Sequence, residues 1–159
     1  MFDVSSRKYG FTDAKTLELQ VSGIFNDVIA IGGVEGVILA SREGFPMFSR
    51  QTSQLDDDSE LLVAAMLSGL MSTVEGATGR MGRSASELVT IESSDGYIVI
   101  CDTFDGVVLA VTTNKTSKLG LIHYIIHHAK KRLVALLSTD REVEGIDDNA
   151  PRQELRGSN

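Results

Sequence analysis

Apolar side chains recur with a helical period in the first third of the chain. They follow one another at steps of three and four, which indicates one buried face of an amphipathic helix, and they are Leu17, Val21, Ile24, Val28 and Ile31. Thr12 or Asp13 can cap the start of this helix. Gly32 and Gly33 are expected to end it, because glycine accepts the left-handed conformation that closes a helix.

A second helix is predicted from the acidic cluster at Asp56, Asp57 and Asp58 to about Thr78, since acids suit a helix N-terminus. Its middle, "LLVAAMLSGLM" (61–71), has almost no polar residue. A helix that is apolar all round must be buried all round, which is difficult in a chain of this size. We therefore expect another chain to cover its outer face, with a purely intramolecular core helix as the alternative. Small residues at helical spacing permit close backbone approach there: Ala65, Gly69, Ser72 and Gly76.

A third helix is predicted from about Lys118 to Leu137. Its apolar face consists of Ile122, Ile125, Ala129, Leu133 and Leu136. Residues 139–159 are polar and are expected to form a disordered tail, and residues 1–12 a flexible lead-in. One domain is thus predicted over residues 13–138.

Five β-rich runs lie between these helices. Residues 34–40 and 45–50 flank the turn "SREG", and Pro46 places the second run at a sheet edge or a strand start, because proline cannot donate a ladder hydrogen bond. Residues 86–94, 97–103 and 107–113 are joined at Asp95-Gly96 and Asp105-Gly106, and Asp-Gly between β-rich runs is a strong hairpin signal. These three runs are predicted to form an antiparallel meander.

The predicted element order is therefore α-β-β-α-β-β-β-α. It indicates an α+β layer fold around a five-stranded, mostly antiparallel sheet. The second helix is expected on one face of the sheet, and the first and third helices on the other.

Composition narrows the function classes. The chain has 159 residues and a net charge of -7, which argues against a nucleic-acid binder and against docking onto anionic lipid. No apolar run approaches the roughly 20 residues of a membrane span, and the N-terminal sequence lacks the pattern of a signal peptide. A single cysteine cannot form an intramolecular disulfide, so a reducing cytoplasm is expected.

The reactive residue types gather between positions 101 and 128. Cys101 is predicted to lie inside a strand as a small buried hydrophobe, without a base or positive group beside it. His123 and His127 share a helix face at zinc-binding spacing, but Tyr124 stands where a zincin has its Glu, and no third ligand is near. A polar stripe facing solvent or a partner is the preferred interpretation of these histidines, including His128.

Two loops resemble nucleotide-binding motifs in composition only. "TNKTSK" (113–118) lies between a strand and a helix but lacks the P-loop glycines, so Thr116 or Ser117 is interpreted as a helix cap. "GGVEGV" (32–37) precedes a strand, whereas a dinucleotide fingerprint follows one. We therefore predict no catalytic residue, no metal site and no cofactor, and a protein that is not an enzyme.

Taken together, the element order and three motifs resemble the roadblock/dynein-light-chain family. "VEGVILASREGFPM" (34–47) is similar to the first hairpin of that family, the apolar second helix to its dimer helix, and "VVLAVTTNKTSKLGLI" (107–122) to its last strand and helix entry. The resemblance covers roughly residues 13–138. Within this family, the chain resembles in particular the activators of bacterial and archaeal polarity GTPases.

The resemblance implies a homodimeric or heterodimeric platform that binds and regulates a small Ras-like GTPase in the cytoplasm. Two copies would pair through the second helix and an adjacent edge strand, with the interface residues Leu62, Ala65, Met66, Gly69, Leu70, Thr73 and Thr90. The GTPase would contact the end of this helix and the loop at 75–86, with Glu75, Arg80 and Arg83. Arg80 or Arg83 could in addition act as an arginine finger supplied to the GTPase. The preferred interpretation is that both are solvated loop arginines. A structural adaptor without effect on nucleotide turnover, and a small-molecule sensor on a related fold, are the alternatives.

Overall fold

Five antiparallel strands form one sheet in the order β2-β1-β5-β4-β3. The computed structural model describes residues 14–53 and 55–144, and side chains within 15–138. The strands are β1 (Val34–Ala40), β2 (Pro46–Gln51), β3 (Val89–Glu92), β4 (Gly96–Asp102) and β5 (Val108–Asn114). Since β5 lies in the centre, the sheet brings the first hairpin and the later meander together.

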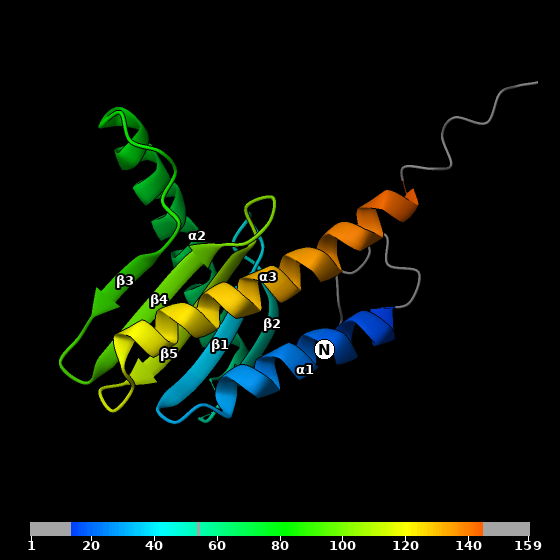
Figure 1. Ribbon diagram of the computed structural model, residues 1–159, viewed down its shortest axis with the longest axis horizontal. Helices are drawn as coiled ribbons and strands as arrows, with labels where there is room; N and C mark the ends of the chain where they lie inside the picture. Colours follow the sequence, from blue (N-terminus) through cyan, green and yellow to red (C-terminus); the bar gives the residue numbers. More distant parts are fainter. Residues whose placement is uncertain (1–13, 54, 145–159) are drawn as a thin grey trace, which may run out of the picture.

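The three helices sandwich this sheet (Figure 1). Helices α1 (Ala14–Ile29) and α3 (Leu119–Glu144) lie side by side on one face, and α2 (Asp57–Arg80) lies on the other. The predicted fold class, element order and distribution of helices over the two faces are confirmed.

Two apolar cores of different size hold the layers together. The larger core lies between the sheet and the α1–α3 pair, and its fully buried side chains include Val21, Ile126, Leu133, Leu39 and Leu109. The smaller core, on the other face, packs Leu67 and Met71 of α2 on Ile38, Ile100, Val108 and Ala110. The helix α2 is thus held by a narrow line of contacts, and the α1–α3 pair by a broad one.

Local turn chemistry explains the strand boundaries. Asp105 and Gly106 both have positive φ, at 54° and 78°, as the tight turn of a two-residue hairpin requires. Pro46 opens the edge strand β2, where its missing N–H breaks no ladder. Both predicted features are confirmed.

Several element boundaries differ from the prediction by one or two residues, and three differences change the description of an element. The first helix ends at Ile29, so Ile31 packs on the core from the turn that follows it. The third helix continues to Glu144, seven residues beyond the predicted Leu137, so residues 139–144 are helical where the polar tail was expected to begin. The run at 86–94 forms a strand only over Val89–Glu92. The expected caps Thr12 and Asp13, the lead-in 1–12 and the tail after residue 144 lie outside the described residues.

Candidate functional site

The helix α2 begins at a well-formed cap. The carboxylate of Asp56 accepts a hydrogen bond of 2.7 Å from the backbone N–H of Ser59, which satisfies one of the free donors of the first turn. This bond holds the pKa of Asp56 below its ordinary value. Asp57, Asp58 and Glu60 add negative charge to the same turn, so the predicted acidic start is confirmed.

One face of α2 is anchored to the sheet and to the β1–β2 turn. Ala64, Leu67, Ser68 and Met71 are buried, and the Ser68 hydroxyl donates a 2.8 Å hydrogen bond to the backbone carbonyl of Ser41. A Cβ at Gly44 in the same turn would lie 2.9 Å from the Cα of Ala65. The small residues at the turn and the helix therefore allow the two backbones to approach closely.

The opposite face of α2 is exposed although it is apolar. Met66 is 68% exposed and Leu62 59%, and the rest of this stripe is Ala65, Gly69, Thr73 and Gly76, all exposed. We call these six residues the outer face of α2. Nothing lies within 4 Å of a Cβ built at Gly69. A contiguous apolar surface of small and flexible side chains is typical of a protein–protein contact.

Of the predicted interface residues, the structure brings those on α2 together and separates Thr90 from them. Leu70 is only half-buried at the border of the outer face, whereas Thr90 lies in the edge strand β3. Its hydroxyl is 3.1 Å from Nε2 of His123 on α3, so its side chain points to the other face of the sheet. The backbone edge of β3 remains open to pairing, but the Thr90 side chain is not part of the α2 surface.

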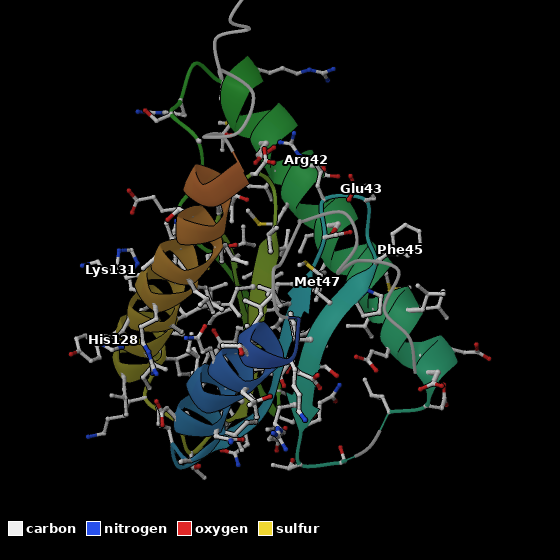
Figure 2. All side chains as sticks on the ribbon, turned by 90° about the vertical axis from the view of Figure 1, so that its right-hand side faces the viewer. Arg42, Glu43, Phe45, Met47, His128 and Lys131 are labelled. Atoms are coloured by element: carbon white, nitrogen blue, oxygen red, sulfur yellow. The ribbon has the colours of Figure 1, made fainter. Side chains whose placement is uncertain are left out.

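Two further exposed apolar residues lie on the side of the sheet that α2 covers, and they were not singled out from the sequence. Ile91 of β3 is 38% exposed, and it points to the same side as Val89, which packs on the smaller core. Phe45, 58% exposed, lies beside α2 at the β1–β2 turn (Figure 2). An alternating strand pattern could have indicated Ile91, but the position of Phe45 depends on the tertiary contact of the turn with α2.

The residues predicted to contact a GTPase lie at the far end of α2. Glu75, Arg80 and Arg83 are all exposed, and the helix end projects past the edge of the sheet (Figure 1). The turn after it is closed by the backbone N–H of Arg83, which donates to the carbonyl of Thr78 at 2.9 Å. The acidic start and the basic end of α2 thus flank its apolar outer face.

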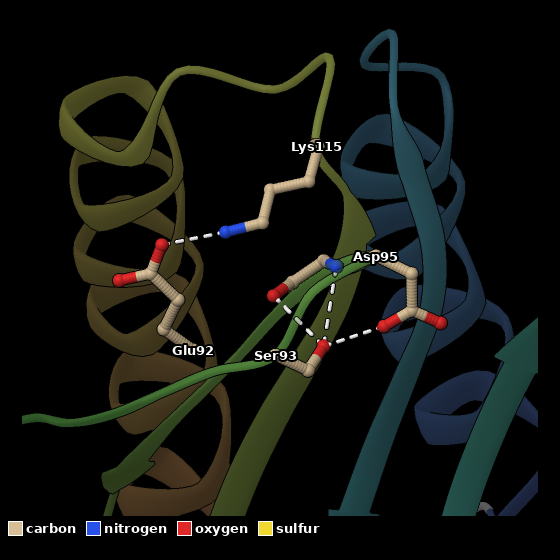
Figure 3. A network of polar contacts seen from close by, with 5 residues as sticks. Glu92, Ser93, Asp95 and Lys115 are labelled. Carbon is tan, nitrogen blue, oxygen red and sulfur yellow. Dashed lines mark hydrogen bonds and ion pairs between the residues drawn. The ribbon is translucent and has the colours of Figure 1, made fainter.

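The turn between the edge strand β3 and β4 is held by polar contacts (Figure 3). The ammonium group of Lys115 lies 2.6 Å from a carboxylate oxygen of Glu92 and 4.3 Å from the ring centroid of Tyr97. The hydroxyl of Ser93 donates to the carboxylate of Asp95 at 2.6 Å. These contacts fix the short hairpin that presents the β3 edge.

The reactive residue types occupy structural positions. Cys101 is buried in the larger core, and desolvation raises the pKa of its thiol to about 12, so at neutral pH it is a protonated hydrophobe. His123 contacts Thr90, while His128 stacks on Tyr124 with ring centroids 6.3 Å apart. Within residues 15–53 and 55–138, no group of three His, Cys, Asp or Glu side chains is placed to hold a metal ion.

By length and composition alone, α2 could also cross a membrane. No membrane span is predicted there from the sequence, because the polar residues within 57–80 interrupt the apolar run of the helix. The same helix packs its inner face on the sheet through Leu67 and Met71. The apolar residues of α2 therefore divide into an inner face that packs on the sheet and an outer face that is exposed.

Comparisons with known proteins agree on one family. Residues 23–113, more than half of the chain, match the family model Robl_LC7, described as the Roadblock/LC7 domain. An uncharacterized protein of Methanocaldococcus jannaschii is 24% identical over 120 residues, which cover 76% of this chain and 98% of that protein.

Solved structures share the fold at low identity. MglB of Myxococcus xanthus superposes with a TM-score of 0.73 at 16% identity, over 82% of this chain and 95% of that one. An MglB with tetrameric arrangement superposes with a TM-score of 0.72 at 10% identity, over 82% of this chain and 95% of that one.

Proposed function

We propose that this chain, which belongs to the Roadblock/LC7 domain family, is a non-catalytic dimeric platform that binds and regulates a small Ras-like GTPase. The observation that carries the proposal is the exposed, apolar outer face of α2. A soluble domain that exposes Leu62 and Met66 next to small residues is incomplete as a monomer. The GTPase as partner rests on what the family resemblance implies.

A second copy of the chain fits this surface by shape. The small side chains of Ala65 and Gly69 allow two helices to approach closely, and Met66 and Leu62 supply the apolar area. A two-fold axis through the outer face would place the same patch of each copy on the other. The interface would consist of Leu62, Ala65, Met66, Gly69, Leu70 and Thr73, with the β3 edge beside it.

Charge favours an antiparallel pairing of the two helices. The first turn of α2 carries Asp57, Asp58 and Glu60, and its last turn carries Arg80, followed by Arg83. In an antiparallel pair, the acidic start of each helix approaches the basic end of its partner, which is attractive at both ends. A parallel pair would bring like charges together. The uneven distribution of charge along α2 therefore favours the antiparallel orientation.

Binding of the GTPase is assigned to the projecting end of α2, with Glu75, Arg80 and Arg83. A regulator acts by favouring one conformation of the switch loops, so it must bind the two nucleotide states unequally. Hydrolysis would remain the work of the GTPase itself, as the family resemblance implies.

The test is a binding measurement with small Ras-like GTPases of the same genome, each loaded with GDP and with a non-hydrolysable GTP analogue. We expect one GTPase to bind, with affinities for the two states that differ by about tenfold or more. Equal affinities would indicate a structural adaptor instead. Binding to none of the GTPases would contradict the proposal.

A further inference from the structure

The charge of this acidic protein is distributed unevenly between its two faces. Residues 106–139 contain no Asp or Glu, whereas they contain five Lys or Arg residues and all three histidines, in a chain of net charge -7. This stretch forms β5 and most of α3. The solvent side of α3 up to residue 138 is therefore a basic surface, and it lies across the sheet from α2. Acidic residues follow only at the end of the helix, at Asp140, Glu142 and Glu144.

Apolar side chains accompany this positive charge along α3. Leu121, Tyr124, His128 and Lys131 follow one another at steps of three and four and are all exposed, with Tyr124 at 69%. Figure 2 shows His128 and Lys131 on the outer side of α3, away from the sheet. The rings of Tyr124 and His128 stack with an interplanar angle of 24°, so this aromatic pair is held ready for contact. We call these four residues the α3 stripe.

A groove runs between the stripe and the end of α1. It has a volume of about 190 Å³ and is lined by Tyr124, His128 and Ile125 on α3, with Val28 and Ile31 on the other side. Arg132 and Asp27 also line it, and their side chains pair at 2.6 Å. The groove thus offers an apolar floor with an ion pair at its border, large enough for one or two apolar side chains.

Two lysines of this surface are available to a ligand. In the part of the chain whose side chains are described, Lys118 and Lys131 are exposed and have no ion-pair partner, whereas Arg132 is occupied by Asp27. A ligand that matches the surface carries negative charge and an apolar side chain. We propose that the α3 stripe and its groove dock an acidic protein segment that inserts an apolar side chain beside Tyr124.

The flanking charges favour a protein segment over an anionic membrane. Asp27 of α1 is exposed next to α3, where it pairs with Arg132. It would repel a flat anionic surface, whereas a narrow segment can lie along α3 and avoid it. This docking goes beyond the proposed GTPase platform, because it uses the opposite face of the sheet. It would give the protein a second partner that binds while α2 is covered.

The experiment uses a fluorescein-labelled 16-residue peptide of glutamate and alanine with leucine at helical spacing, and follows anisotropy with the full-length chain at low salt. We expect binding that weakens as salt is raised. Lys118→Glu combined with Lys131→Glu should weaken it by about tenfold or more. Tyr124→Ala should weaken it by about threefold or more, since an aromatic anchor is lost.

Three controls make the result specific. Arg50→Glu on β2 reverses one exposed charge, as each of the two lysine substitutions does, at a residue that does not line the groove. It should leave binding within about twofold, and a peptide with lysine in place of glutamate should not bind. Wild-type affinity weaker than about 1 mM, or an equal loss in Arg50→Glu, would overturn the proposal. Phosphatidylserine vesicles that bind through Lys118 and Lys131 while the peptide does not would assign the surface to a membrane and also overturn it.

Discussion

At the scale of single residues, the potentially reactive thiol of the chain is buried and packs as an apolar group. Cys101 is the chain's one cysteine, and its side chain points from β4 into the larger core. Burial disfavours the thiolate, which raises its pKa from 9.0 to about 12. The same residue that suggests nucleophilic chemistry in the sequence therefore contributes to stability as a neutral group.

This shift predicts a loss of stability at high pH. The unfolded thiol ionises above about pH 9 while the folded thiol stays protonated, so its contribution is fully present below pH 9 and is lost as pH rises toward 12. The free energy of unfolding should fall by about 1.4 kcal/mol per pH unit in that window because of this group. Urea titrations at pH 8 and 10.5 should show a larger loss in the wild type than in Cys101→Ala. Parallel curves for the two proteins would contradict the assignment.

The cap of α2 makes a prediction at the acidic end of the pH scale. The pKa of Asp56 is lowered by its bond to Ser59, so the cap stabilises the helix above the ordinary carboxyl pKa and is lost as pH falls below it. Asp56→Ala should lower the thermal midpoint by a few degrees at pH 7. The difference should shrink as the pH falls below the ordinary carboxyl pKa. Asp57→Ala, which removes a charge of the same turn without the cap bond, should have the smaller effect at pH 7.

At the scale of elements, close backbone approach decides which glycines matter. A Cβ at Gly96 would lie 1.8 Å from the carbonyl oxygen of Thr113, whereas a Cβ at Gly120 in the first turn of α3 meets nothing within 4 Å. The Thr113 carbonyl belongs to the central strand β5, so it cannot move without disturbing its neighbours.

Gly96→Ala should therefore destabilise the fold by about 2–4 kcal/mol, at the severe end for a single substitution. Gly120→Ala should be neutral or stabilise by about 0.5 kcal/mol, because alanine is the better helix former. Denaturant unfolding of both variants measures this contrast. Similar losses at the two positions would show that the β4–β5 contact does not limit Gly96.

Much of the arrangement of elements could be predicted from local signals. Asp105-Gly106 indicated a turn and Pro46 a sheet edge or a strand start by backbone geometry alone, and the largely apolar middle of α2 indicated a helix. The end of α3 could not be predicted, because residues 139–144 are polar and carry no apolar period. The strand β3 is short because only Val89–Glu92 pair with β4, and local sequence does not show where that pairing begins.

The candidate site was predicted less completely than the fold. The helical period identified which α2 residues share a face, and that face is the exposed one. The sequence could not reveal that Thr90 points toward His123, because strand alternation does not say which helix covers which side. The contribution of Phe45 was equally hidden, since it depends on the contact of the β1–β2 turn with α2.

At the scale of the whole molecule, the sheet separates two surfaces of different chemistry. One is the apolar outer face of α2, with acids at its start and arginines at its end. The other is the basic and aromatic stripe of α3. A platform with two such faces can hold two partners without competition between them.

The arginines at the end of α2 are expected to position a GTPase without catalysing hydrolysis. Both side chains are exposed, and any loop arginine fits so permissive a motif. Arg80→Ala combined with Arg83→Ala should leave stimulated GTP hydrolysis nearly intact in single-turnover assays, although the affinity for the GTPase falls. A loss of about a thousandfold in the hydrolysis rate would instead identify an arginine finger.

The central claim is that a second copy covers the outer face of α2, and sedimentation equilibrium of the wild type and of Gly69→Arg tests it most directly. The open space at Gly69 lets a protomer accept arginine without rearrangement, so this substitution acts on association. We predict a wild-type mass of twice 17.2 kDa, or a higher even multiple. For Gly69→Arg we predict a mass of 17.2 kDa, with Leu19→Asp on the exposed side of α1 as a dimeric control. A wild type that sediments as a monomer, or a Gly69→Arg variant that remains a dimer, would contradict the account.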